Sequence, residues 1–193
     1  MDRISGMREL APVLGDAVVV AGLGYASWAL FSEADRDENL YMGGAMGLGS
    51  SVALGIALAR TERQVLCMEG DGSLLMNLGS LASIGATAPP NLTVVVWDDG
   101  LYLTTGGQPT HTGGAVSLAA VAHGCGIPRV HEVEAEGPLA DAVRDAFAGA
   151  GPALVVAKIG RESSRPARCR MPLVVIRHRL MQALGTCRCH GRE

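Results

Sequence analysis

The chain has 193 residues, of which 48% are hydrophobic and 26 are glycines, and its formal net charge is −3. This length is enough for one well-buried domain and short for two, and the hydrophobic fraction excludes intrinsic disorder. No apolar run approaches the roughly eighteen residues of a membrane span, and residues 1–5 lack the basic-then-apolar layout of a signal peptide. We therefore expect a cytoplasmic protein that does not interact with membranes.

Strand-like apolar runs alternate with helix-like segments along the chain. In order, the sequence predicts a strand at 17–20, a short helix at 27–31, a polar loop at 32–39, a helix at 46–60, a strand at 64–68, a helix at 73–86, a strand at 92–97, a loop at 98–114, a helix at 116–123, a strand at 129–133, a helix at 139–148 and a strand at 153–159. Strands without polar alternation are typical of a parallel sheet covered on both faces. We expect an α/β domain with a doubly wound, mostly parallel sheet, helices on both faces and ligands at the carboxyl ends of the strands.

The last part of the chain differs in charge from the rest. Residues 161–193 contain eight Arg and two Glu, so this segment carries +6 and residues 1–160 carry −9. We interpret 1–160 as one domain and 161–193 as a basic linker, a closing helix at 172–184 and a tail. No aromatic residue is interleaved with the basic ones, so we do not expect nucleic acid as a partner. The segment is a solvated arm or a surface for an acidic partner.

The cysteines fit a reducing compartment, with Cys67 and Cys125 in segments where a small buried hydrophobe is usual. Cys187, Cys189 and His190 near the C-terminus lack the spacing and the fourth ligand of a zinc site. We expect a frayed tail there.

Two acidic turns follow apolar runs. Gly70-Asp71-Gly72-Ser73 comes after the strand at 64–68, and Asp98-Asp99-Gly100 follows the next strand, with Asp98 placed 27 residues after Asp71. Mg²⁺ prefers hard oxygen ligands and shares them between one or two carboxylates, substrate phosphates and water, and glycines let the backbone approach phosphates closely. Either turn alone is an ordinary glycine turn. The two together predict a site for Mg²⁺ and a diphosphate.

This pair of turns resembles the signature of thiamine diphosphate (ThDP) enzymes. The resemblance implies that the side chains of Asp71 and Asp98 and the carbonyl of Gly100 ligate the metal. Asp98 stands where most of that family has Asn. An aspartate still ligates Mg²⁺, but it adds a negative charge beside the diphosphate.

A second resemblance lies in the small-residue segment 41–51. In ThDP enzymes a bulky apolar residue in such a segment props the bent cofactor, and Met46 matches it here. The Gly44 carbonyl matches the acceptor for the aminopyrimidine. The alternative is a glycine-rich helix start with Met46 as core filler.

The loop from Tyr102 to His111 most resembles the small β subunits of sulfopyruvate decarboxylase and the related phosphonopyruvate decarboxylases, and the resemblance extends over about 22–159. A histidine at position 111 can contact an anionic substrate or shuttle a proton, although an exposed loop histidine is an equal alternative. The candidate catalytic residues are Met46 and His111. The candidate cofactor-binding residues are Gly44, Ala45, Met46, Gly70, Asp71, Gly72, Ser73, Asp98, Gly100, Leu101 and Tyr102.

The resemblance also implies that this chain is only half of an enzyme. In that family the pyrimidine ring lies between two domains and meets a glutamate, whereas this chain has length only for the diphosphate-binding domain. We therefore expect a ThDP- and Mg²⁺-binding subunit of a two-component 2-oxo acid decarboxylase, completed by a pyrimidine-binding subunit in a heterotetramer or larger assembly. The contact surface is expected near 42–46 and 104–110.

Three alternatives remain beside this hypothesis. A carboligase subunit has the same machinery and passes the product carbanion to a second carbonyl. A non-catalytic partner retains the fold alone. A nicotinamide-binding domain is suggested by Gly22-Leu23-Gly24, but the third glycine is missing and Glu33 comes too early for a ribose contact. A ferredoxin oxidoreductase subunit is disfavoured because no cysteine set has iron–sulfur spacing.

Overall fold

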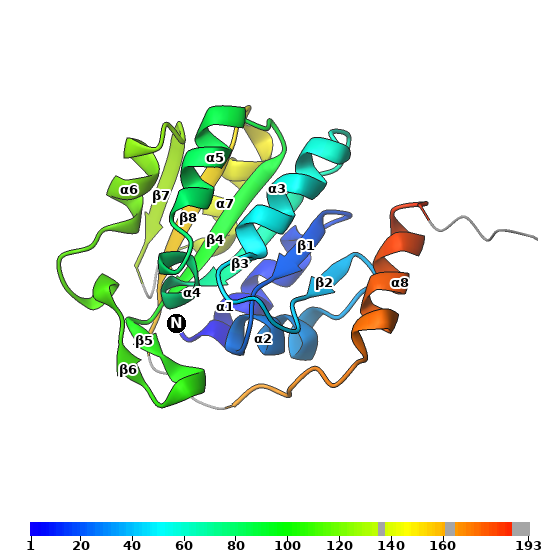
Figure 1. The fold of residues 1–193 in the computed structure, drawn as a ribbon, viewed down its shortest axis with the longest axis horizontal. Helices are drawn as coiled ribbons and strands as arrows, with labels where there is room; N and C mark the ends of the chain where they lie inside the picture. The colour runs from blue at the N-terminus through cyan, green and yellow to red at the C-terminus, as the bar shows by residue number, and fades with distance from the viewer. Residues whose placement is uncertain (135–137, 161–164, 187–193) are drawn as a thin grey trace, which may run out of the picture.

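A six-stranded sheet forms the centre of the computed structural model, which describes residues 1–134, 138–160 and 165–186 (Figure 1). Its strand order is β2-β1-β3-β4-β8-β7, and every neighbouring pair is parallel. The strands are β1 Val18–Ala21, β2 Asn39–Tyr41, β3 Val65–Gly70, β4 Leu92–Asp98, β7 Arg129–Val133 and β8 Ala153–Lys158. The predicted parallel sheet is confirmed.

The apolar strands are buried because both faces of the sheet are covered. All seven residues of β4 are buried. Along β3, Leu66 packs into one core cluster and Cys67 into the cluster on the opposite face, as the two-residue period of a strand requires. Burying a large aliphatic side chain contributes about 1.5–3 kcal/mol, so two such layers stabilise the sheet strongly.

Helices cover the two faces in separate groups (Figure 1). One group comprises α1 Arg3–Leu10, α2 Tyr25–Ala34 and α7 Leu139–Ala148. The other comprises α3 Gly49–Ala59, α5 Gly79–Thr87 and α6 Leu118–Gly124. The short helix α4, Asp71–Leu75, starts directly at the end of β3. This arrangement confirms the doubly wound architecture.

The expected helix at 73–86 was wrong, since two helices occupy this region and α4 ends at Leu75 before α5 begins at Gly79. Between them, the Asn77 side chain donates hydrogen bonds to the Gly47 carbonyl (3.0 Å) and to Ser51 Oγ (3.1 Å). At the break, the N–H groups of Met76 and Asn77 bond the carbonyls of Ser73 and Leu74, three residues back, so the α-helical hydrogen-bond pattern ends there. The Asn77 side chain thus connects the region between α4 and α5 to Gly47 and to the start of α3.

The helix expected from residue 46 begins three residues later, at Gly49. Ala45 and Gly47 have φ angles of 59° and 88°, in the left-handed region where a right-handed helix cannot continue. Met46 therefore lies in a turn before the helix.

Three further elements were not anticipated. Helix α1 starts after Asp2, whose side chain accepts a hydrogen bond from Ser5 N (2.8 Å) as an N-cap. The expected loop at 32–39 instead includes the end of α2 and the start of the edge strand β2. The loop at 98–114 contains a small antiparallel ribbon of β5 Leu101–Tyr102 and β6 Gln108–Pro109.

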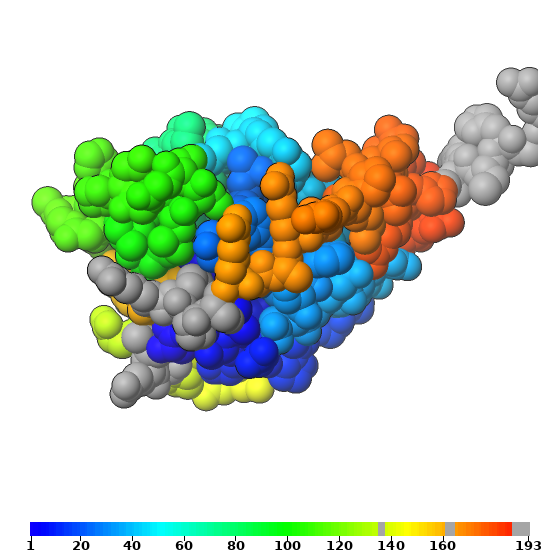
Figure 2. Space-filling view, turned by 90° about the horizontal axis from the view of Figure 1, so that it is seen from below, coloured from blue at the N-terminus to red at the C-terminus, as the bar shows by residue number. Residues whose placement is uncertain are grey.

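The C-terminal segment packs against the sheet domain. Residues 165–172 cross α2, drawn in orange over blue in Figure 2. The guanidinium of Arg165 lies 5.1 Å from the centroid of the Trp28 ring, and Ala167 N donates to Ser32 Oγ (2.9 Å). Helix α8, Leu173–Ala183, follows beside β2 and buries Ile176 and Leu180, which confirms the expected closing helix. Cys187, Cys189 and His190 lie outside the described residues.

Within the described ranges, no helix is both long and apolar enough to cross a membrane.

Candidate functional site

The two acidic turns lie side by side at the carboxyl ends of β3 and β4. Gly70 pairs with Trp97 in the sheet register, so the next residue on each strand, Asp71 and Asp98, extends from neighbouring strand ends. Both carboxylates are buried, with exposures of 1% and 4%. The parallel sheet thus brings together two acidic residues that are far apart in sequence.

Two threonine hydroxyls contact these carboxylates, and one of them bridges the pair. Thr112 Oγ1 is 2.8 Å from Asp71 Oδ2 and 2.8 Å from Asp98 Oδ1, and the Thr110 hydroxyl donates to Asp71. A hydroxyl carries one proton, so Thr112 can donate to only one of the two carboxylates at a time. The pair offers more acceptor oxygens than these hydroxyls have protons, which is a chemistry that suits a hard cation.

Burial raises the pKa of the Asp71 carboxyl. The hydroxyls of Thr110 and Thr112 oppose that shift, and the charges of Asp98 and Asp99 add to it. A buried carboxylate surrounded by like charges is stabilised by a divalent cation.

Backbone and ligand oxygens would have to complete a metal shell. In the described part of the chain, no group of three or more His, Cys, Asp or Glu side chains could hold a metal ion. Two carboxylates and one carbonyl fit Mg²⁺, which commonly takes its remaining ligands from phosphates and water. The Gly100 carbonyl accepts a hydrogen bond from Thr110 N (2.8 Å) and still has a second lone pair. The donor set therefore fits the implied metal.

Basic side chains accompany the second turn. Lys158 Nζ at the end of β8 lies 2.5 Å from Asp98 Oδ2. Arg3 Nη2 lies 3.0 Å from Asp99 Oδ2, and the other oxygen of Asp99 accepts from Leu101 N (3.1 Å). Ion pairs thus hold the turn after β4.

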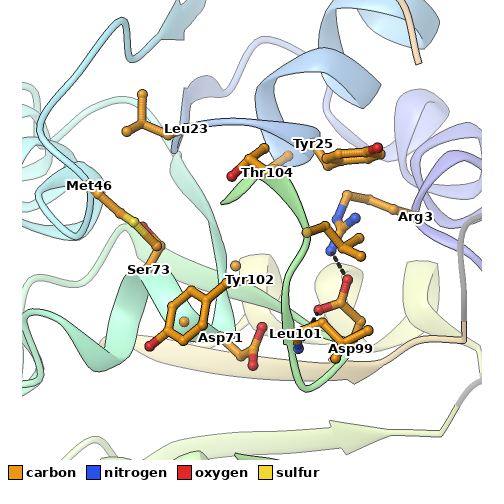
Figure 3. Close-up of a pocket in the computed structure, with 14 residues that line it drawn as sticks. Arg3, Leu23, Tyr25, Met46, Asp71, Ser73, Asp99, Leu101, Tyr102 and Thr104 are labelled. Carbon is orange, nitrogen blue, oxygen red and sulfur yellow. Dashed lines mark hydrogen bonds and ion pairs between the residues drawn. The ribbon is translucent and has the colours of Figure 1, made fainter. Parts of the chain in front are cut away.

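A pocket opens beside the first turn (Figure 3). Met46, Ser73 and the ring of Tyr102 border one part of it, and Arg3 and Tyr25 border another. Of the predicted site residues, the pocket is lined by Met46, Gly70, Asp71, Gly72, Ser73, Leu101 and Tyr102, whereas Gly44, Ala45, Asp98, Gly100 and His111 lie outside its lining.

Gly72 is required by the close approach of Tyr102. A Cβ atom at position 72 would overlap the Tyr102 ring and crowd the Thr110 methyl group. Gly100 has a φ of 68°, so the second turn also uses a conformation that favours glycine.

A buried network fixes the Met46 turn against the first acidic turn. Gly47 N donates to Ser73 Oγ (3.0 Å), and the Ser73 hydroxyl donates to Glu69. Glu69 is completely buried, and burial raises its pKa, while the Ser73 hydroxyl and the N–H groups of Gly49 and Ser50 oppose the shift. This network holds Met46 at the edge of the pocket.

His111 lies outside the pocket beside the first turn. It is exposed and borders a separate hollow with Pro109, Gly113 and Val116. Its neighbours Thr110 and Thr112, not predicted from sequence, carry the contacts to Asp71.

Residues in two further parts of the site were not predicted from the sequence. Leu23 and Tyr25 line the pocket where α2 begins, and the glycines around Leu23 after a strand were the available signal. Lys158 is the only lysine among the 16 Lys and Arg residues, and its location directly at a strand end could have marked it.

Residues 26–157 match the family model described as the C-terminal TPP binding domain of thiamine pyrophosphate enzymes, and the chain belongs to this family. Thiamine pyrophosphate is another name for ThDP. The match covers the strands that carry both acidic turns.

Relatives extend the comparison. The chain is 35% identical over 183 residues to the sulfopyruvate decarboxylase subunit beta of Methanocaldococcus jannaschii, covering 94% of this chain and 96% of that one. It is 48% identical over 148 residues to phosphonopyruvate decarboxylase of Streptomyces viridochromogenes, covering 77% of this chain and 37% of the other. The chain therefore spans about a third of the latter relative.

Solved structures share the fold. A ThDP-dependent 4-hydroxybenzoylformate decarboxylase from Rhodococcus jostii superposes with a TM-score of 0.70 at 22% identity, over 85% of this chain and 33% of that one. A putative thiamin diphosphate-dependent enzyme from Mycobacterium smegmatis gives the same score and identity over 84% of this chain and 32% of that one. These similarities confirm the ThDP-binding fold.

Proposed function

We propose that the chain is the ThDP- and Mg²⁺-binding subunit of a two-component decarboxylase that acts on a small 2-oxo acid of the sulfopyruvate or phosphonopyruvate kind. The observation that carries the proposal is the pair of buried carboxylates, Asp71 and Asp98, at adjacent strand ends beside a pocket. Near-full-length similarity to sulfopyruvate decarboxylase β subunits supports the subunit role.

The chain's residues have distinct tasks in this proposal. Asp71, Asp98 and the Gly100 carbonyl hold Mg²⁺, and the backbone from Gly70 to Ser73 holds the diphosphate. When bound, ThDP supplies a nucleophilic carbon and an electron sink for decarboxylation. Met46 would prop the cofactor from the edge of the pocket. The Gly44 carbonyl, outside the pocket lining, would accept from the aminopyrimidine. Leu101 and Tyr102 line the pocket, and the Tyr102 ring packs against Gly72.

Buried Glu69 supports the Met46 turn through a chain of hydrogen bonds. It bonds Ser73, which in turn bonds Gly47 next to Met46. Ala45 has an unfavourable left-handed φ of 59°, and such local strain is retained where surrounding contacts impose it. The Met46 turn is therefore held in one conformation before the cofactor binds.

A second subunit completes the site in this proposal by supplying a pyrimidine-binding domain and its glutamate. Residues 43–45 and 104–109 are exposed, as expected for a contact surface. Leu48 and Met76 are large exposed hydrophobics at 45% and 62%, and Leu173 at 60% packs over Gly43. A contiguous group of exposed apolar side chains suits a protein partner, and Leu48 and Met76 both lie beside Gly47. The simplest assembly is a heterotetramer with two sites between unlike subunits.

Release of carbon dioxide from sulfopyruvate, phosphonopyruvate and pyruvate tests the proposal. The full chain is assayed alone and with a co-expressed pyrimidine-binding subunit, in saturating ThDP and Mg²⁺. We expect carbon dioxide release from sulfopyruvate or phosphonopyruvate, which carry a second anionic group at carbon three, and only when both subunits are present. Release from the chain alone, free of any co-purifying subunit, contradicts the two-component proposal, and consumption without an aldehyde product indicates carboligation instead.

A further inference from the structure

Lys158 and Asp98 form an ion pair that the sheet itself positions. They are register partners on the adjacent parallel strands β8 and β4, so their side chains leave the sheet on the same side. Lys158 Nζ lies 2.5 Å from Asp98 Oδ2. The Asp98 side chain is 3% exposed and that of Lys158 is 34% exposed, so the ion pair reaches from the interior to the surface.

The two oxygens of Asp98 have different neighbours. Oδ2 meets Lys158, whereas Oδ1 faces the Thr112 hydroxyl that also lies 2.8 Å from Asp71. A lysine fixed on Oδ2 therefore turns Oδ1 toward the space between the two carboxylates. Outer partners of this kind orient a carboxylate ligand, and their loss typically weakens metal binding about 10–100-fold.

The charges around the site also favour a cation beside Asp98. Asp71, Asp98 and Asp99 place three carboxylates at the ends of two neighbouring strands, where a diphosphate would add further negative charge. Arg3 pairs with Asp99, and Lys158 pairs with Asp98, so each acid of the second turn has a cationic neighbour. The Asp98–Lys158 pair carries no net charge.

We propose that Lys158 is a positioning residue that aims Asp98 Oδ1 at the metal site and cancels the charge of Asp98, so that this turn accepts Mg²⁺ together with an anionic diphosphate. This inference rests on the proposed function. Lys158 does not touch the metal or the substrate and acts through Asp98.

A double-mutant cycle measured by calorimetry tests this role. ThDP is titrated at fixed Mg²⁺ concentrations into the full chain, alone and with the partner subunit, for the wild type, Lys158→Met, Asp98→Asn and the double variant. We expect Lys158→Met to weaken ThDP binding about 10–100-fold and to raise the Mg²⁺ concentration needed for half-maximal binding. In the Asp98→Asn background the same substitution should change the affinity by less than about threefold, because the charge that needs Lys158 is gone.

Controls separate this role from a general effect on folding. Lys158→Arg keeps the positive charge and should weaken ThDP binding less than Lys158→Met does. Arg144→Met removes an exposed cation paired with Asp141 on α7, and should leave ThDP affinity and its Mg²⁺ dependence unchanged. Thermal unfolding of each variant confirms folding, and Lys158→Gln replaces Lys158→Met if the latter does not fold.

The outcomes distinguish the two hypotheses. A wild type without Mg²⁺-dependent ThDP binding, even with its partner, overturns the proposed function. If the wild type binds and Lys158→Met has no effect, or has the same effect with Asn at position 98, the positioning role alone is overturned.

Discussion

The two acidic turns at the carboxyl edge of the sheet have the same residue types but opposite electrostatic surroundings. After β3, the Asp71 side chain has hydroxyl partners, Thr110 and Thr112, within the described part of the chain. After β4, Asp98 pairs with Lys158 and Asp99 pairs with Arg3. The negative charge of the first turn is therefore left uncompensated, and that of the second is neutralised by the protein.

If Mg²⁺ binds here as proposed, this contrast indicates which aspartate would depend on it more. Burial raises the pKa of Asp71, which means that its charged form is destabilised in the folded chain without a cation. An ion beside Asp71 removes that penalty, whereas Asp98 already has a cation. We expect the two positions to respond very differently to substitution.

Asp71→Ala has the largest expected effect. Removing the uncompensated carboxylate should weaken Mg²⁺–ThDP binding more than about 100-fold and abolish activity, because the diphosphate loses the cation that neutralises it. Stability of the metal-free chain should not fall, since a buried charge with a raised pKa is removed. Calorimetry checks the affinity, and an unchanged value would defeat the site assignment.

Thr112→Val removes the hydroxyl shared by the two turns. In the metal-free chain we expect the free energy of unfolding to fall by about 1–3 kcal/mol, because buried acceptors lose their donor. Saturating Mg²⁺ and ThDP should restore most of that loss if the metal lies between the two carboxylates. Denaturant unfolding with and without these ligands measures the difference, with Thr87→Val on the exposed end of α5 as a control. A loss that is equal in both conditions contradicts the bridging position.

Met46→Ala tests whether the site beside Asp71 also depends on a bulky side chain that props the cofactor. We expect the catalytic constant to fall about tenfold or more while ThDP affinity changes less, because a prop acts on the reactive geometry. Steady-state kinetics of the two-subunit enzyme and ThDP titration provide the two numbers. Met181→Ala, at a half-buried methionine on α8 away from the site, is the matched control. Equal activity of Met46→Ala and the wild type would make Met46 a core filler.

Asp98→Asn has the smallest expected effect. An amide oxygen still offers a ligand and the charge of the turn decreases by one, so ThDP affinity should change by only a few-fold, in either direction. The same titration measures it. A loss as complete as that of Asp71→Ala would show that the two turns are not electrostatically different.

Much of this architecture follows from the sequence. The apolar runs predicted the parallel sheet, and Asp71 and Asp98 were placed together because each directly follows such a run. Gly70, Gly72 and Gly100 marked the turns. These are local signals, and adjacent parallel strands convert them into a shared site.

The partners of the turns could not be predicted in the same way. Lys158 meets Asp98 only because β8 inserts beside β4 in one particular register, and Thr112 reaches both carboxylates only through the path of the loop after β6. At the break between α4 and α5, Asn77 bonds the Gly47 carbonyl, which is a tertiary contact. Such pairings depend on the assembled fold.

We propose above all that Asp71 and Asp98 share a divalent cation on which diphosphate binding depends. Calorimetric titration of ThDP into the full chain with its partner subunit, in Mg²⁺ and then in excess chelator, tests it most directly. We expect one saturable site per chain in Mg²⁺ and at least about 100-fold weaker binding without it. Equally tight ThDP binding in chelator would show that the diphosphate does not depend on a cation held by Asp71 and Asp98.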